Sequence, residues 1–365
     1  MTHPQPDFNG PCIEIHLTPG GVDIHQQRPA ITRALVGLPA TVALQRIPSL
    51  LPICGNAQAI AAARAVAAAK GNAQHPQPDL DASLRQEQAL ACGWRLCVDW
   101  PDLLGETRQM TALKQLYQAQ DDKQRATALG QMITGMDTVR SLEALLAWVE
   151  DSDCLAARVI RHTAEATGAN ARIQEALPLL DESGLRSRAC AALAAEPFDP
   201  LDPAGGPLEM GPLAMGRDPL VMALQDSMGS TVLSRLLAQL LDTRFIARAL
   251  LATPSEQQPA GAPASARSLP RTGDTNSGMG WAVTARGPVF HQVQLADGAD
   301  TAADTVVDWR VLAPTDWHFG RHGPVKRELS LLEASTRGQV ALVVASYDPC
   351  APWTLHRAAT AEHHA

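Results

Sequence analysis

Two cysteines near opposite ends of the chain lie in short stretches whose residue types suit metal binding. Cys54 lies in the stretch ICGNA, and Cys350 lies in the stretch DPCAPWTLH, which ends at His356. Thiolates are soft donors that suit low-valent iron and nickel. A metal held by both cysteines would require the two ends of the chain to meet. The alternative for either cysteine is a small core residue, the usual role of a free cysteine.

The two stretches resemble the R-I-C-G-x-C and D-P-C-x-x-C-x-x-H motifs that hold the nickel–iron centre in the large subunit of [NiFe] hydrogenases. The first cysteine of each motif is present, and Ala57 and Trp353 replace the second. Further matches follow in family order: EMGPLA from 209, TARGPVFH from 284, VLAPTDW from 311 and GP from 323. The chain is most similar to the hydrogenase expression/formation proteins of the HupK/HoxV type, which are cofactor-assembly relatives of the large subunit.

This resemblance implies a ligand set. Cys54 and Cys350 match the terminal nickel ligands, while both bridging thiolates are missing, which argues against nickel uptake. Two thiolates can still hold one preformed Fe(CN)2(CO) unit transiently, because that iron already carries strong ligands. Arg286 is expected to point toward a cyanide ligand, where a guanidinium donates hydrogen bonds in a rigid fork; the alternative is an arginine in a surface salt bridge. His356 matches a histidine of the family's magnesium site.

Other departures from the family argue against an enzyme. The family's proton-relay glutamate belongs to an R-I-E-G-H motif, and Glu14 fits better as a residue of the strand that follows this motif. The glutamate of the magnesium site aligns with Thr32. A proton gate, a metal ligand and both bridging thiolates are therefore missing together, and we expect no catalysis.

The resemblance implies a cytoplasmic assembly scaffold or chaperone. It would hold the Fe(CN)2(CO) unit during hydrogenase maturation and pass it to the large-subunit precursor, with HypC/HypD-type maturation proteins as further partners. The alternative is a metal-free interaction module that imitates the large subunit and binds maturation partners.

Composition limits the other functions. The chain has 365 residues, 45% of them hydrophobic, and a net charge of −8. It shows no run of basic residues, so we expect no nucleic-acid partner. No apolar stretch of membrane-spanning length and no signal peptide are visible, so we expect a cytoplasmic protein without a membrane partner. Seven scattered cysteines form no disulfide framework, and we assign Cys92 and Cys97 to the core.

The patterns predict a mainly α fold with a small β-sheet (α+β), a truncated form of the large-subunit fold, in a single domain covering 1–365. The sheet is expected to combine N- and C-terminal strands: a hairpin over 12–25 and strands over 281–295 and 305–312. A stretch rich in proline, alanine and serine, Pro254 to Gly278, is expected to be a disordered insertion. Expected helices cover Ile31 to Val36, a second segment before Pro52, 57–70, one capped by Ser83, 142–149, much of 155–195, and 233–241.

Two stretches are predicted as loops. Gly205 to Pro219 is rich in glycine and proline. The second predicted loop contains Trp317, His318, Arg321 and His322. We interpret it as a solvated corner, and a set of metal ligands is the alternative.

Overall fold

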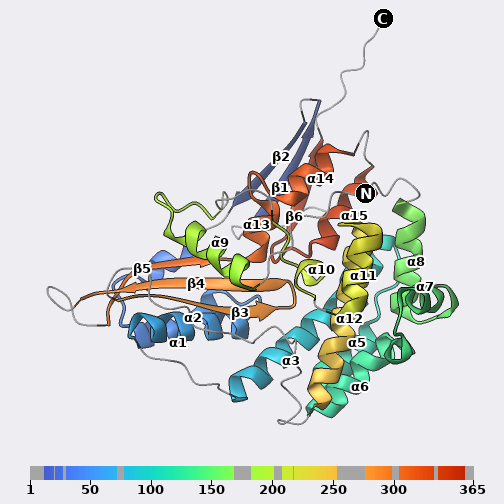
Figure 1. Ribbon diagram of the computed structural model, residues 1–365, viewed down its shortest axis with the longest axis horizontal. Helices are drawn as coiled ribbons and strands as arrows, with labels where there is room; N and C mark the ends of the chain where they lie inside the picture. Colours follow the sequence, from blue (N-terminus) through green and yellow to red (C-terminus); the bar gives the residue numbers. More distant parts are fainter. Residues whose placement is uncertain are drawn as a thin grey trace, which may run out of the picture.

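A three-stranded antiparallel sheet lies between two layers of helix in the computed structural model. Its order is β3 (Ser277–Thr284), β4 (Gly287–Leu295), β5 (Val306–Leu312). The alanine-rich helix α2 (Gly55–Ala69) packs on one face and α9 (Glu182–Ala194) on the other. Both layers are visible in Figure 1. Because both faces of the sheet are covered, β3 and β4 are almost fully buried.

The structure describes residues 12–19, 21–27, 30–71, 78–167, 182–200, 208–216, 218–252, 276–297, 304–332 and 336–357. Most of these residues are helical. The remaining helices are α1 (Ala40–Leu50), α3 (Pro78–Trp94), α4 (Trp100–Leu104), α5 (Met110–Gln118), α6 (Asp122–Met132), α7 (Leu142–Asp151), α8 (Leu155–Thr167), α10 (Pro212–Met215), α11 (Pro219–Met228), α12 (Val232–Leu251), α13 (Pro314–Phe319), α14 (Pro324–Ser330) and α15 (Arg337–Ser346). None of the helices in these ranges is long and apolar enough to cross a membrane.

A second sheet joins the two ends of the described chain. The hairpin of β1 (Cys12–Thr18) and β2 (Gly21–Gln27) is antiparallel, and β6 (Trp353–Arg357) pairs with β1 in parallel. Ile13 and Ile15 point into the core, while Glu14 and His16, which alternate with them, lie on the outer face. β6, the strand that follows Cys350, is thereby fixed against β1.

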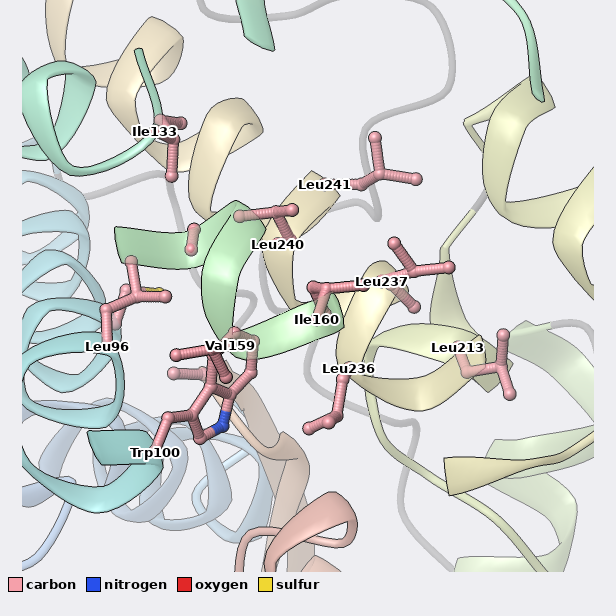
Figure 2. Packing of buried hydrophobic residues seen from close by; sticks show 14 of the residues in the cluster. Leu96, Trp100, Ile133, Val159, Ile160, Leu213, Leu236, Leu237, Leu240 and Leu241 are labelled. Carbon is pink, nitrogen blue, oxygen red and sulfur yellow. The ribbon is translucent and has the colours of Figure 1, made fainter. Parts of the chain in front are cut away.

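The long helix α12 forms the centre of the largest hydrophobic cluster. Leu236, Leu237 and Leu240 are fully buried and pack against helices α3, α6 and α8. Figure 2 shows these leucines among side chains such as Trp100 and Val159. Thr231 caps the helix, since its side chain accepts a hydrogen bond from the backbone of Ser234.

The mainly α fold, the hairpin, the alanine-rich helix and α7 are confirmed. The single small sheet is wrong, because β3–β5 form their own sheet. Ser83 lies inside α3 and does not cap it, and the predicted helix at Ile31 is a 3-10 segment, Ile31–Leu35. Residues 254–275 of the predicted insertion lie outside the described residues, but Ser277 and Gly278 at its end belong to β3.

Two predicted loops are also corrected. The region 205–219 contains the short helix α10 and the first residue of α11. Trp317 and His318 belong to α13 and are buried, because α13 packs against β4 and Tyr347; of these four residues only Arg321 and His322 are exposed. Cys92 and Cys97 are buried core residues, as predicted.

The contact between β3 and α2 generates a prediction. A Cβ at Gly280 would lie 2.3 Å from the carbonyl oxygen of Ala61 and 2.4 Å from the backbone nitrogen of Ala65. Gly280→Ala should therefore destabilise the protein by about 1–3 kcal/mol, because neither backbone can give way. Gly130→Ala in α6, where nothing lies within 4 Å, is the control and should be neutral or slightly stabilising. Urea unfolding midpoints measure both, and equal midpoints would refute this packing.

Candidate metal-unit site

Cys54 lies directly before α2, in a left-handed backbone conformation with φ 61°. This turn precedes the alanine-rich helix, whose small side chains allow β3 to approach closely. The carboxylate of Glu87 from α3 accepts hydrogen bonds from the backbone nitrogens of Asn56 (2.6 Å) and Ala57 (3.1 Å). These bonds satisfy the free N–H groups of the first turn and fix the position of the cysteine.

Arg286 connects Cys54 to the segment that carries Cys350. It lies in the turn between β3 and β4, and its Nη1 donates to the Cys54 sulfur at 3.5 Å. Its Nη2 lies 3.4 Å from Oδ1 of Asp348. The other oxygen of Asp348 lies 2.6 Å from Nη2 of Arg95, which is itself buried. One carboxylate is therefore shared by two guanidinium groups.

The two arginines determine the charge state of Asp348. Burial alone would raise the pKa of the carboxyl group, but the positive charges of Arg286 and Arg95 outweigh it and lower the pKa below its ordinary value. Asp348 therefore stays ionised at neutral pH. Its backbone is held at φ 48°, in the left-handed region that non-glycine residues rarely adopt, and this turns the chain toward Cys350.

Thr315, at the start of α13, holds Cys350. Its hydroxyl donates to the Cys350 sulfur at 3.0 Å and accepts from the Cys350 backbone nitrogen at 3.1 Å. A negative charge on Cys350 raises the pKa of Cys54, and both thiols interact electrostatically with Arg286. The structure thus brings together the three predicted residues Cys54, Cys350 and Arg286.

The Cys54 thiol is protonated at neutral pH. Burial raises its pKa to about 11, and the charges of Glu87 and Cys350 raise it further, while Arg286 opposes them. A metal that binds here must displace the thiol proton, and without a metal Cys54 is not a reactive thiolate.

A buried ionic cluster on α12 fixes the segment before Asp348. Arg235 lies 2.8 Å from Glu328 and 3.2 Å from Glu209, and its guanidinium stands 3.9 Å from the ring centre of Tyr347. The Tyr347 hydroxyl donates to Glu328 at 3.0 Å. These interactions hold Tyr347 next to the site.

A small polar cavity borders this cluster and reaches Arg286 and Asp348. His318 lines it, and burial lowers the pKa of this imidazole to about 3, so it is neutral. Its Nε2 accepts from the backbone nitrogen of Met210 at 3.0 Å, and its Nδ1 is buried without a hydrogen-bond partner, as is Nε of Arg286. Arg286, which contacts the Cys54 sulfur, therefore keeps a buried donor without a partner.

His356 lies elsewhere. It sits on the outer face of β6, where its Nε2 is 3.1 Å from the Thr354 hydroxyl and its ring stacks on His16 at 4.6 Å. None of its contacts within the described residues involves Cys54 or Cys350. The magnesium site that the resemblance implies does not fit this chain, because Thr32 offers a hydroxyl where that site needs a carboxylate.

Sequence reasoning missed four supporting residues: Glu87, Arg95, Thr315 and Asp348. Thr315 and Asp348 lie within motifs that were recognised, so a residue-by-residue reading of those motifs finds them. Glu87 lies on α3 and Arg95 begins the π-helical segment Arg95–Asp99 that follows it, and no local pattern marks either residue. Only the tertiary structure shows that they face the site.

Known proteins that are similar to this chain are named as hydrogenase expression/formation proteins. The chain is 30% identical to "Hydrogenase expression/formation protein HupV" of Azotobacter chroococcum mcd 1, over 93% of this chain and 95% of the relative. It is 28% identical to "Hydrogenase expression/formation protein HoxV" of Cupriavidus necator, over 92% of this chain and 93% of the relative. No family model matches.

Solved structures show the same fold. The chain superimposes on a variant [NiFeSe] hydrogenase of Desulfovibrio vulgaris Hildenborough with a TM-score of 0.52 and 13% identity, over 90% of this chain and 92% of that one. The fold is that of a [NiFe] hydrogenase large subunit, as the motifs indicated.

The two charges beside Cys54 should shift its reactivity in opposite directions. Glu87→Gln removes a negative charge, which should lower the pKa of the thiol and speed its alkylation at pH 8 at least about threefold. Arg286→Met keeps the side-chain length but removes the positive charge, and should slow the reaction by a similar factor. Mass spectrometry of the Cys54 peptide after iodoacetamide treatment measures both rates. Shifts of the same sign would contradict this electrostatic account.

Proposed function

Because the chain belongs to the family of hydrogenase expression/formation proteins, we propose that it is a non-catalytic scaffold in [NiFe] hydrogenase maturation. In this role it holds the Fe(CN)2(CO) unit transiently and passes it to the large-subunit precursor. The unit is cargo and leaves the protein.

One observation carries the proposal: two cysteines near opposite ends of the chain both interact with one partly buried arginine. Arg286 contacts the Cys54 sulfur only at 3.5 Å and Asp348 only at 3.4 Å, and its Nε has no partner. A guanidinium offers five donors, so this arginine has capacity for a further acceptor. A cyanide nitrogen, anionic and partly buried, suits such donors. The two thiolates would complete the coordination of the iron.

The thiol chemistry suits a temporary holder. The Cys54 thiol must lose a proton to bind iron, and its pKa of about 11 makes this loss costly near neutral pH. This cost weakens iron binding, and reprotonation of the thiol assists release of the unit.

The missing groups support a role without turnover. Ala57 and Trp353 supply no thiolate, so the site lacks the donors that would bridge a second metal. Ala57 is fully buried in α2 and its backbone nitrogen is bonded to Glu87. A nickel ion would find only the two cysteines as soft ligands in this arrangement.

The shared fold supports the choice of partners. A maturation protein that recognises the large-subunit precursor by its fold would meet a similar backbone arrangement on this chain. HypC/HypD-type proteins are therefore the proposed donors of the iron unit, and the precursor is the proposed acceptor.

Infrared spectroscopy of protein purified from cells that express the maturation machinery tests the proposal. The wild-type protein should show cyanide and carbonyl stretching bands. Cys350→Ser should abolish them, because a hydroxyl does not replace a soft thiolate at neutral pH. Cys154→Ser, a partly buried cysteine on another side of the core, is the matched control and should retain the bands.

Two results would contradict the proposal. Bands that persist in both Cys54→Ser and Cys350→Ser would exclude ligation by these thiols. A wild-type protein without bands that still binds the large-subunit precursor would favour the metal-free interaction module instead.

A further inference from the structure

The outer face of the sheet β2–β1–β6 gathers metal-ligating side chains that the iron-unit site does not use. Glu14 and His16 project from β1, and His356 projects from β6, which is paired directly with β1 so that His16 faces His356. The potential ligand atoms of these three residues all lie within 4.8 Å of one another. In Figure 1 this sheet lies at the edge of the molecule, away from the sheet β3–β5.

Neighbouring side chains already orient the cluster. Nε2 of Gln27 donates to Oε1 of Glu14 at 3.0 Å, which leaves Oε2 of Glu14 3.4 Å from Nε2 of His16. The ring of His25, on the next strand, meets the ring of His16 edge-on at a centroid distance of 5.2 Å. Supporting hydrogen bonds of this kind are typical of ligands that are held ready for a metal.

The side chains around the cluster leave its three residues free to bind a metal ion. Asp23 on the neighbouring strand β2 forms an ion pair with Lys326 at 3.1 Å and is therefore not counted among the metal ligands. Glu14 and His16 have about one third of their side chains exposed, so water and ions reach them. Around one metal, donor atoms stand about 3.3 Å apart, and rotation of these exposed side chains closes the remaining gap.

We propose that Glu14, His16 and His356 form a binding site for a borderline divalent transition ion, such as Zn²⁺ or Ni²⁺. Two imidazoles and one carboxylate suit these ions and not Mg²⁺, which takes oxygen ligands. This site differs from the magnesium site implied by the resemblance in its metal and in its other ligands. His356 is the residue that the two ligand sets share.

Metal binding at this site would link strand β1 to strand β6. β6 begins three residues after Cys350, so an ion that links β6 to β1 also restrains the segment that carries this cysteine. The site thus acts on the architecture of the iron-unit site without contacting it. This inference does not rest on the proposed cargo.

Separate titrations with Zn²⁺ and Ni²⁺ test the site in the full chain. All variants carry His363→Ala and His364→Ala, so that this terminal pair does not compete. One equivalent should bind, and His16→Ala or His356→Ala should weaken it at least about tenfold. His162→Ala is the matched control, because His162 is an exposed histidine that pairs with one carboxylate, Glu106, at 2.7 Å.

A second readout guards against misfolded variants. Saturating Zn²⁺ should raise the thermal unfolding midpoint by about 3–5 °C, and this rise should disappear in Glu14→Gln, which preserves size and hydrogen bonding to Gln27. Affinity that is unchanged in His16→Ala and His356→Ala would overturn the proposal. Affinity lost only in the double variant Cys54→Ser/Cys350→Ser would place the ion at the thiols and overturn it equally.

Discussion

The carboxylate of Asp348, shared between Arg95 and Arg286, is the interaction on which the site depends. Its three members come from the π-helical segment Arg95–Asp99 after α3, the β3–β4 turn and the segment before Cys350, so one ion triad joins three distant parts of the chain. Removing one member of such a triad leaves a charge unpaired in the interior, which costs about 3–5 kcal/mol. The positions of Cys54 and Cys350 therefore depend on the carboxylate of Asp348.

A second ionic cluster supports the first from the α12 side. Arg235 holds Glu328 and Tyr347, and Nε2 of Gln239 donates to the carbonyl oxygen of Ser346 at 2.8 Å. Because α12 is packed on several sides by leucines, it provides a rigid support for the residues that lead to Asp348. Buried polar residues on an otherwise apolar helix thus have a positional role: they hold the residues that lead to Asp348.

Local patterns predicted what depends on local physics. Alanine content predicted α2, and alternation predicted the β1–β2 hairpin. The separate sheet β3–β5 and the burial of Trp317 were not predictable in this way, because they depend on which strands meet and on what packs beneath them. The motifs identified Cys54, Cys350 and Arg286, and the structure brings these three residues together, whereas the partnership of Arg95 with Asp348 needed the tertiary structure.

The central claim is that Cys54 and Cys350 together ligate one iron. X-ray absorption at the iron edge of the iron-loaded protein measures this directly, because it counts the sulfur atoms bound to the metal. The account predicts two sulfur ligands in the wild-type protein and one in a Cys54→Ser variant that retains iron. A wild-type spectrum with no sulfur ligand, or with the same sulfur count after that substitution, would contradict it.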